Sequence, residues 1–212
     1  MMECDAQAVA SKVVDVLRHR KVPIGISNRH VHLSERDFEQ LFPGQSLTVD
    51  KPLLQPGHFA ATQTVTLKGP KGVLNNVRIL GPLRPNTQVE VSATQARELG
   101  IKAPVRMSGE LEGSPGIQII SNFAEVTLEQ GVIVANRHIH MNSFDALLFG
   151  VDDCQRIDVL VGEPPRTVLF KNVVIRVDPQ LVLEMHLDTD EANAAGLTGM
   201  KDTGQIMLGS KG

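Results

Sequence analysis

The pentapeptide NRHVH at residues 28–32 returns as NRHIH at residues 136–140, an offset of 108 residues. An internal repeat constrains a fold more strongly than local propensity, because each copy must build the same kind of unit. Further matches follow at an offset of 96, where VLNNVRI aligns with FKNVVIRV and SATQARELG with DTDEANAAG. The chain therefore holds two copies of one unit. The extra residues of the first copy are expected around LLQPGHFAATQ.

The segments after Pro23 predict an all-β fold. Short runs rich in Val, Ile and Thr, bounded by Gly, Pro and Asn, are typical of strands; they are TQTVTLKG, NNVRILG, GIQIIS, GVIVAN and NVVIRV. Short helical caps are expected at ERDFEQLF, ATQAREL, SFDALLF and TDEANAAG. We expect two pseudo-repeated small β-barrels, one over residues 28–135 and one over residues 136–212, preceded by an N-terminal amphipathic helix within residues 1–22.

The N-terminal segment DAQAVASKVVDVLRHR, residues 5–20, has the apolar spacing of an amphipathic helix. The stripe consists of Ala6, Val9, Val13, Val16 and Leu17. Two interpretations stay open for it. The helix either packs on the body of the protein or docks on a partner surface, and in both cases His19 is expected on the solvated face.

Composition narrows the classes of partner. A net charge of -3 and the absence of Trp and Tyr argue against nucleic acid as a partner. No apolar run is long enough to span a bilayer, and the N-terminus lacks the apolar core of a secretory signal, so we expect no membrane partner and a cytoplasmic location. Cys4 and Cys154 form no CxxC pair, which indicates reduced, incidental thiols.

Each copy of the repeat offers three residues able to bind a metal. In an extended strand, residues i and i+2 share a face, so both rings of an HxH pair can converge on one ion. At the offset of 96, Glu90 aligns with His186 and completes each set. The two triads are His30, His32 and Glu90 in the first copy, and His138, His140 and His186 in the second. Three such ligands are typical of a catalytic zinc with an open position.

The arrangement of these triads stays open, since each copy could build its own site or the two sets could face each other. Two ions close together would form a clamp for a reacting anion or carbonyl. His58 lies in the segment assigned to the insertion and could approach the site, although a simple loop histidine is the favoured interpretation.

Two further polar residues stand out. Arg84 aligns with Gln180 in the second copy, so only one copy offers a guanidinium at this place. Guanidinium is a planar donor suited to phosphate, and an exposed loop arginine is the competing explanation. Ser108, within RMSGELEG, is either a turn residue or a hydroxyl donor to a bound ligand.

Several motifs in order resemble the PduL-type phosphate acyltransferases, also called phosphate propanoyltransferases. They are SNRHVHLS, LLQPGHFAATQTVTLKGPKG, GPLRPNTQVEVS, APVRMSG, ANRHIHM and EMHLDTDEANAAG. The resemblance implies two small β-barrels with a di-zinc site, and a leading strand, residues 23–27, that crosses over to complete the C-terminal barrel. It also implies that both triads hold zinc and that Arg84 binds phosphate.

The resemblance further implies exchange of an acyl group, propionyl or acetyl, between coenzyme A and phosphate. In family members that work inside bacterial microcompartments, a short N-terminal helix serves for encapsulation. Residues 5–20 resemble such a helix, so the chain could contact shell or cargo proteins through it. The chain could also form a homo-oligomer. Two alternatives stay open: a binuclear metallohydrolase of phospho- or thioesters, and a non-catalytic, metal-stabilised binding module.

Overall fold

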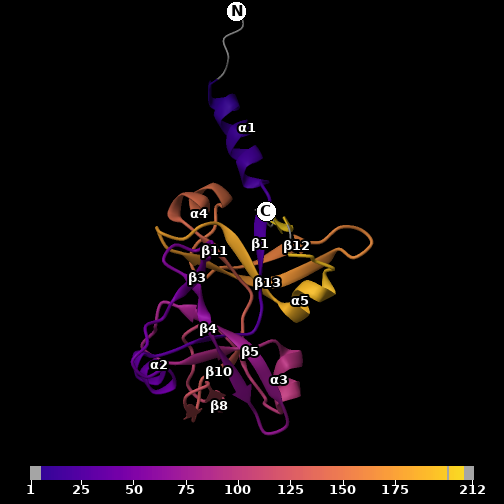
Figure 1. Cartoon of the computed structure of the whole chain (residues 1–212). Coiled ribbons are helices and arrows are strands. Elements are labelled where there is room, and N and C mark those ends of the chain that lie inside the picture. The colour runs from indigo at the N-terminus through magenta and orange to yellow at the C-terminus, as the bar shows by residue number, and fades with distance from the viewer. Residues whose placement is uncertain (1–5, 200, 208–212) are drawn as a thin grey trace, which may run out of the picture. The chain divides into compact units, whose positions relative to one another are not determined.

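The computed structural model describes residues 6–199 and 201–207 (Figure 1). Residues 1–5 of the expected N-terminal segment, with Cys4, and residues 208–212 of the expected second barrel lie outside the described residues. The helices are α1 (Ala6–Arg18), α2 (Glu35–Leu41), α3 (Ala93–Leu99), α4 (Ser143–Phe149) and α5 (Thr189–Ala194). Except for α1 they are short, as expected for caps between strands.

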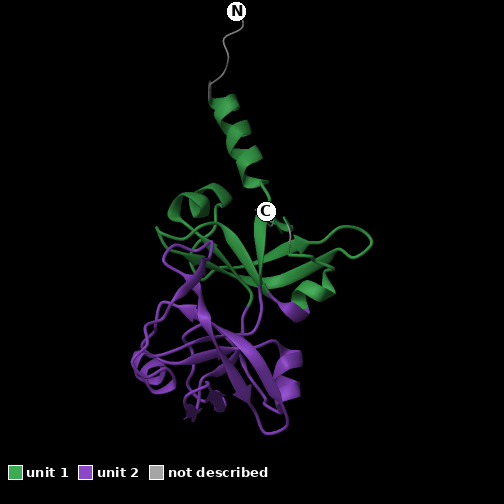
Figure 2. Cartoon of the chain, in the orientation of Figure 1, with its two compact units in different colours: residues 1–26, 137–187, 191–212 green, residues 27–136, 188–190 purple. Residues whose placement is uncertain are grey.

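The chain divides into two compact units, coloured separately in Figure 2. We call residues 1–26, 137–187 and 191–212 the barrel unit, and residues 27–136 and 188–190 the sheet unit. The strands of the barrel unit close in the order β1-β14-β11-β13-β12-β15. They are β1 (Val22–Ser27), β11 (His138–Met141), β12 (Arg156–Val161), β13 (Val168–Val177), β14 (Glu184–Asp188) and β15 (Thr203–Met207).

The sheet unit holds a nine-stranded sheet in the order β7-β10-β6-β2-β5-β4-β8-β9, with β3 paired to β4. Its strands are β2 (His30–His32), β3 (Val49–Pro52), β4 (Phe59–Lys68), β5 (Val73–Gly81), β6 (Gln88–Glu90), β7 (Val105–Arg106), β8 (Ile117–Ile120), β9 (Glu125–Leu128) and β10 (Val132–Ala135). The prediction of an all-β fold built from two barrel-like units with short helices is confirmed.

The strands that lead into the two NRHxH motifs exchange units. β1 precedes the first motif, whose strand β2 lies in the sheet unit, yet β1 joins the barrel unit beside β14. β10 precedes the second motif and joins the sheet unit, where it pairs in parallel with β6. Each unit therefore contains one strand from the other copy of the repeat.

Each unit has its own hydrophobic core. Val31 and Ile79 are fully buried in the sheet unit, as are Ile139 and Ile175 in the barrel unit.

Local sequence signals set the ends of the helices. Helix α3 begins with a capping box between Ser92 and Gln95 and ends at a left-handed glycine, and α4 also ends at a left-handed glycine. Ser34 before α2 and Asn142 before α4, which are 108 residues apart, each cap their helix through the side chain, so the repeat preserves the start of this helix.

The extra residues of the first copy lie between α2 and β4. In the second copy, only a short connection joins the equivalent elements α4 and β12. The additional chain forms β3, which pairs antiparallel with β4. The sequence had placed the insertion around LLQPGHFAATQ, but the extra chain already includes the preceding strand β3. This start was missed because a short exposed strand has no distinctive sequence pattern of its own.

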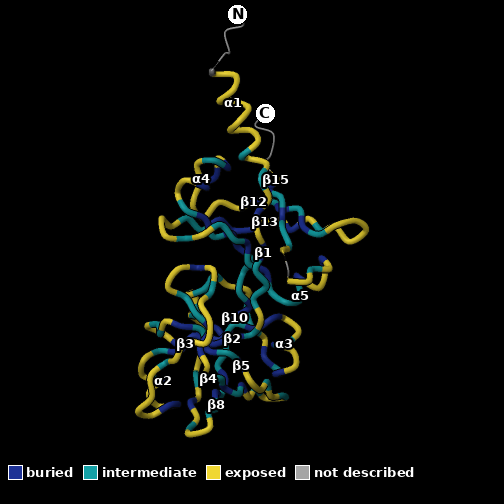
Figure 3. Tube along the Cα trace, turned by 45° about the horizontal axis from the view of Figure 1, so that its top comes forward, coloured by how far each residue is buried: buried dark blue, intermediate teal, exposed yellow. Residues whose placement is uncertain are grey.

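Helix α1 leaves the valines of its apolar stripe exposed. Val9, Val13 and Val16 are 49%, 51% and 65% exposed, and Figure 3 shows the helix coloured as exposed over most of its length. The helix end is held by polar contacts, in which Arg18 Nε donates to the Leu148 carbonyl (3.1 Å) and Arg20 pairs with Asp145. The helix thus contacts α4 at its C-terminal end, while three valines of the stripe stay exposed, so both interpretations of the segment remain predictions. No helix among them is long and apolar enough to cross a membrane.

Candidate functional site

The first candidate site lies in the sheet unit, on the paired strands β2 and β6. These strands run antiparallel with His30 directly opposite Glu90. His30 and His32 share one face of β2, while Val31 between them points to the opposite face and is fully buried in the core. The register and the strand period together bring three metal-binding side chains to one place.

The donor atoms of this group, which we call triad 1, all lie within 4.8 Å of one another. His30 Nε2 is 3.4 Å from Glu90 Oε2. The other ring nitrogens contact backbone oxygens, His30 Nδ1 at 2.8 Å from Asn28 O and His32 Nδ1 at 3.2 Å from Leu80 O. Because a carbonyl oxygen only accepts, each Nδ1 carries a proton, and Nε2 is the nitrogen left to bind a cation.

Burial and neighbouring charges set the protonation of triad 1. Burial lowers the pKa of His30, but the Glu90 carboxylate outweighs it, and the net pKa lies above the ordinary value of 6.5. Burial, with the charges of His30 and Arg84, lowers the pKa of His32 to about 2. Burial raises the pKa of Glu90, but His30 outweighs it and the pKa lies well below its usual range. Neutral His32 and ionised Glu90 are the forms that bind metals.

The second candidate site, triad 2, lies in the barrel unit on β11 and β14. His138 lies directly opposite His186, and the donor atoms of the three histidines are again within 4.8 Å of one another. The ring centroids are 4.6 Å apart for His138 and His140, and 4.7 Å apart for His140 and His186. Each triad is thus complete within one unit and within one copy of the repeat.

A hydrogen-bonded network connects Arg84 to triad 1. Arg84 Nη1 donates to Ser108 Oγ (3.0 Å), and Ser108 Oγ donates to Glu90 Oε1 (3.3 Å). Gln88 Nε2 donates to both Glu90 Oε1 (2.5 Å) and Ser108 Oγ (2.8 Å). The side-chain oxygen of Gln88, Oε1, accepts a hydrogen bond from Gly109 N at 2.7 Å. The side-chain amide of Gln88 therefore fixes the loop that carries Ser108. Arg84 and Ser108 therefore lie beside the Glu90 carboxylate.

The structure brings together the six predicted metal-binding residues as two groups of three, and places Arg84 and Ser108 beside the first group. His58 belongs to neither group, and His19 directly follows α1, where its ring contacts the Asp15 carbonyl. The described cysteine, Cys154, is exposed and also outside both groups.

Two polar residues of the site were not singled out in the sequence. Gln88 bridges Glu90 and Ser108, and Glu184 Oε2 lies 2.7 Å from His186 Nε2. Both lie two residues before the third member of their triad, on the same strand face, and they are 96 residues apart. The repeat offset applied to Gln88 would have found the pair.

The comparisons with known proteins agree on one family. The sequence model described as "Phosphate propanoyltransferase" matches residues 23–198. The chain belongs to the phosphate propanoyltransferase family. It is 57% identical over 190 residues to the phosphate propanoyltransferases of Citrobacter rodentium and Salmonella typhimurium, covering 90% of both chains in each case. It is 52% identical over 200 residues to that of Shewanella putrefaciens, covering 94% of this chain and 95% of the relative.

Membership of this family identifies the chain as an acyltransferase enzyme and supports phosphate acyltransferase activity. The donor chemistry of both triads fits a divalent cation that accepts nitrogen and oxygen ligands, since imidazole and carboxylate are typical zinc donors.

The pairing of His30 with Glu90 predicts a titration in the metal-free protein. Wild-type His30 is expected to keep its proton above pH 6.5, and in Glu90→Gln its pKa should fall below 6.5, because burial then acts without the carboxylate. NMR titration of the ring in the presence of a chelator measures both values. The stabilisation from raising the pKa of His30 is present below pH 6.5 and lost as pH rises through the raised pKa. An unchanged pKa in Glu90→Gln would contradict this account.

Proposed function

We propose that this enzyme transfers an acyl group between coenzyme A and phosphate, so that propionyl-CoA or acetyl-CoA and phosphate give acyl phosphate and free CoA. Propionyl-CoA is the first choice because the relatives are named phosphate propanoyltransferases. The proposal also rests on a pair of features that this reaction needs side by side: a guanidinium for phosphate and a cluster of metal ligands.

The observation that carries the proposal is the connection of Arg84 to Glu90 through the Ser108 hydroxyl. A guanidinium fixed by a hydrogen bond loses less conformational freedom when it binds an anion. Arg84 would bind phosphate bidentately and direct it to triad 1, while Ser108 and Gln88 hold the arginine and the carboxylate in place. Gln180, the residue aligned with Arg84 in the second copy, cannot supply this charge.

We further propose that triad 1 and triad 2 each hold one zinc ion. Zinc bound there would supply a Lewis acid that polarises an oxygen of the substrates. The chain's own part is to position phosphate, through Arg84, for attack on the thioester carbonyl. A phosphate oxygen forms the new bond to the carbonyl carbon, the C–S bond breaks, and CoA leaves as the thiolate. Direct transfer is favoured over a covalent acyl-enzyme, because the sequence has no evident nucleophilic Cys or Ser motif and the described cysteine, Cys154, lies exposed and outside both triads.

Replacement of Arg84 tests the reaction. Arg84→Ala is expected to lower kcat/KM for phosphate by about a hundredfold or more, because a charged hydrogen-bond donor to the reacting group is lost. Arg84→Lys should recover only part, since lysine is not a bidentate donor. The measurement is phosphate-dependent release of CoA from propionyl-CoA, with acyl phosphate detected as the product. Arg97→Ala, on the surface of α3 in the same unit, is the matched control and should leave turnover unchanged.

The same assay separates the other interpretations of the triads. Release of CoA that does not require phosphate would indicate a metallohydrolase and contradict acyl transfer to phosphate. Zinc binding without turnover of either acyl-CoA would indicate a metal-stabilised binding module. Full activity of Arg84→Ala would contradict the assigned role of the arginine while leaving acyl transfer intact.

We also propose that α1 docks on a shell or cargo protein of a bacterial microcompartment. The exposed stripe of Val9, Val13 and Val16 supports this, because an apolar helix face is buried when it binds a partner groove. Val13→Asp combined with Val16→Asp should leave turnover unchanged and abolish co-sedimentation with assembled shells. Ser11→Asp adds a charge on the opposite side of the helix and is the matched control. Co-sedimentation that survives the double substitution would contradict the proposal.

A further inference from the structure

The second candidate site has a carboxylate that lies outside triad 2. Glu184 precedes His186 by two residues in β14, so both side chains point to the same face of the strand. Glu184 Oε2 lies 2.7 Å from His186 Nε2, and the two side chains are 15% and 23% exposed. In the strand pairing, Glu184 is directly opposite His140. The carboxylate therefore lies next to the histidine ring in a largely desolvated place.

The repeat gives Glu184 a counterpart of different charge. Gln88 stands at the equivalent position of the first copy and donates a hydrogen bond to Glu90, the third member of triad 1. In both copies, then, the side chain two residues before the third member of the triad hydrogen-bonds to that member. The carboxylate occupies a different position in each copy. In the first copy it is the third member of the triad, Glu90, and its neighbour is the neutral amide of Gln88; in the second copy it is Glu184, and the third member of the triad is the imidazole of His186. Each site consequently contains one carboxylate from this pair of positions.

The backbone of β1 leaves room for the Glu184 carboxylate. A Cβ placed on Gly25 would lie 2.6 Å from Glu184 Oε1, closer than such contacts occur, and the remaining near atoms are also of Glu184. Gly25 and Glu184 both belong to the barrel unit, where β1 is the neighbour of β14. The absence of a side chain at residue 25 is therefore a requirement of the observed carboxylate position.

The group of mutually close donor atoms in the barrel unit consists of the three histidines and does not include Glu184. We propose that Glu184 is a positioning residue, which holds the His186 ring by accepting its Nε2–H and supplies triad 2 with the negative charge that Glu90 supplies to triad 1. Carboxylates that accept a hydrogen bond from a metal-binding histidine fix its orientation and make it a better ligand. The inference rests on the proposed metal function.

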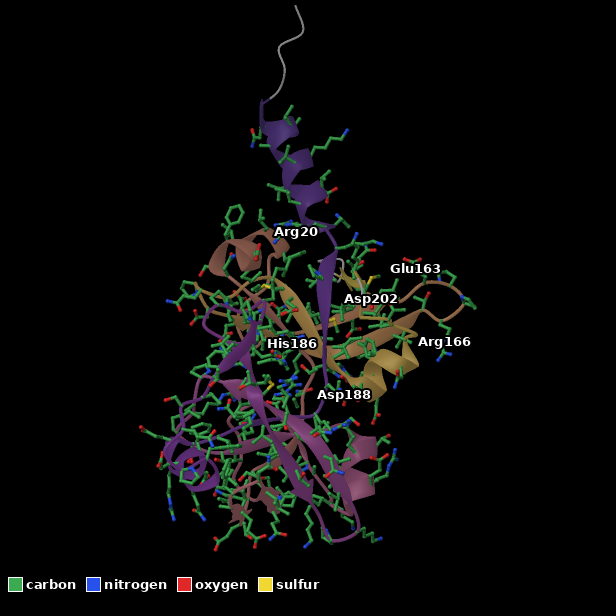
Figure 4. All side chains as sticks on the ribbon, viewed as in Figure 1. Arg20, Glu163, Arg166, His186, Asp188 and Asp202 are labelled. Carbon is green, nitrogen blue, oxygen red and sulfur yellow. The ribbon has the colours of Figure 1, made fainter. Side chains whose placement is uncertain are left out.

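Zinc affinity of the full-length chain tests this role. In Glu184→Ala, one of the two ions should bind about tenfold to a hundredfold more weakly, as measured by competition with a chelator, while the other binds as in the wild type. Glu184→Gln keeps an oxygen acceptor without the charge and should recover part of the affinity. Glu163→Ala is the control, since Glu163 is exposed on the loop between β12 and β13, away from His186 (Figure 4).

Gly25→Ala provides an independent test in which the carboxylate itself is unchanged. The added methyl group would displace Glu184, so the variant should show the same weakening of one ion. A wild-type chain that binds two ions, together with unchanged affinities in both Glu184→Ala and Gly25→Ala, would overturn the role of Glu184. A wild-type chain that binds no zinc would instead contradict the proposed metal function, so the two failures are distinguishable.

Discussion

Antiparallel strand pairing is the constraint on which both candidate sites depend. A histidine pair spaced two residues apart can converge on an ion only while its strand stays extended, and the third donor is brought opposite by register. His30 faces Glu90 across β2 and β6, and His138 faces His186 across β11 and β14. A slip of one residue in either pair would turn the third donor to the other face, so the hydrophobic residues that fix the register also fix the site.

The exchange of leading strands links these registers to the rest of the chain. β1 lies beside β14 in the barrel unit, and β10 lies beside β6 in the sheet unit, so each third donor sits on a strand supported by the other copy. Neither unit can be completed from one continuous repeat. The exchanged strand β1 also affects the second candidate site, because Gly25 in β1 has no side chain and leaves room for Glu184 of β14.

The sequence predicted most of the fold because repeated motifs carry both strand patterns and helix caps. The four short helices lie where ERDFEQLF, ATQAREL, SFDALLF and TDEANAAG placed them. The start of the insertion could not be predicted, since β3 is short and exposed, and an amphipathic stripe alone could not tell a packed α1 from an exposed one. The triads could be assembled by aligning Glu90 with His186, whereas Gln88 and Glu184 gain meaning only when strand faces are known. The six residues' role as zinc ligands stays a prediction.

The central proposal is that each copy of the duplicated unit holds one metal ion through its own triad. The most direct measurement is the zinc content per chain of the purified protein, combined with X-ray absorption at the zinc edge. The account predicts two ions with only nitrogen and oxygen neighbours, and one ion in either His32→Ala or His140→Ala. Sulfur in the coordination shell, or the loss of both ions on changing a single triad, would contradict it.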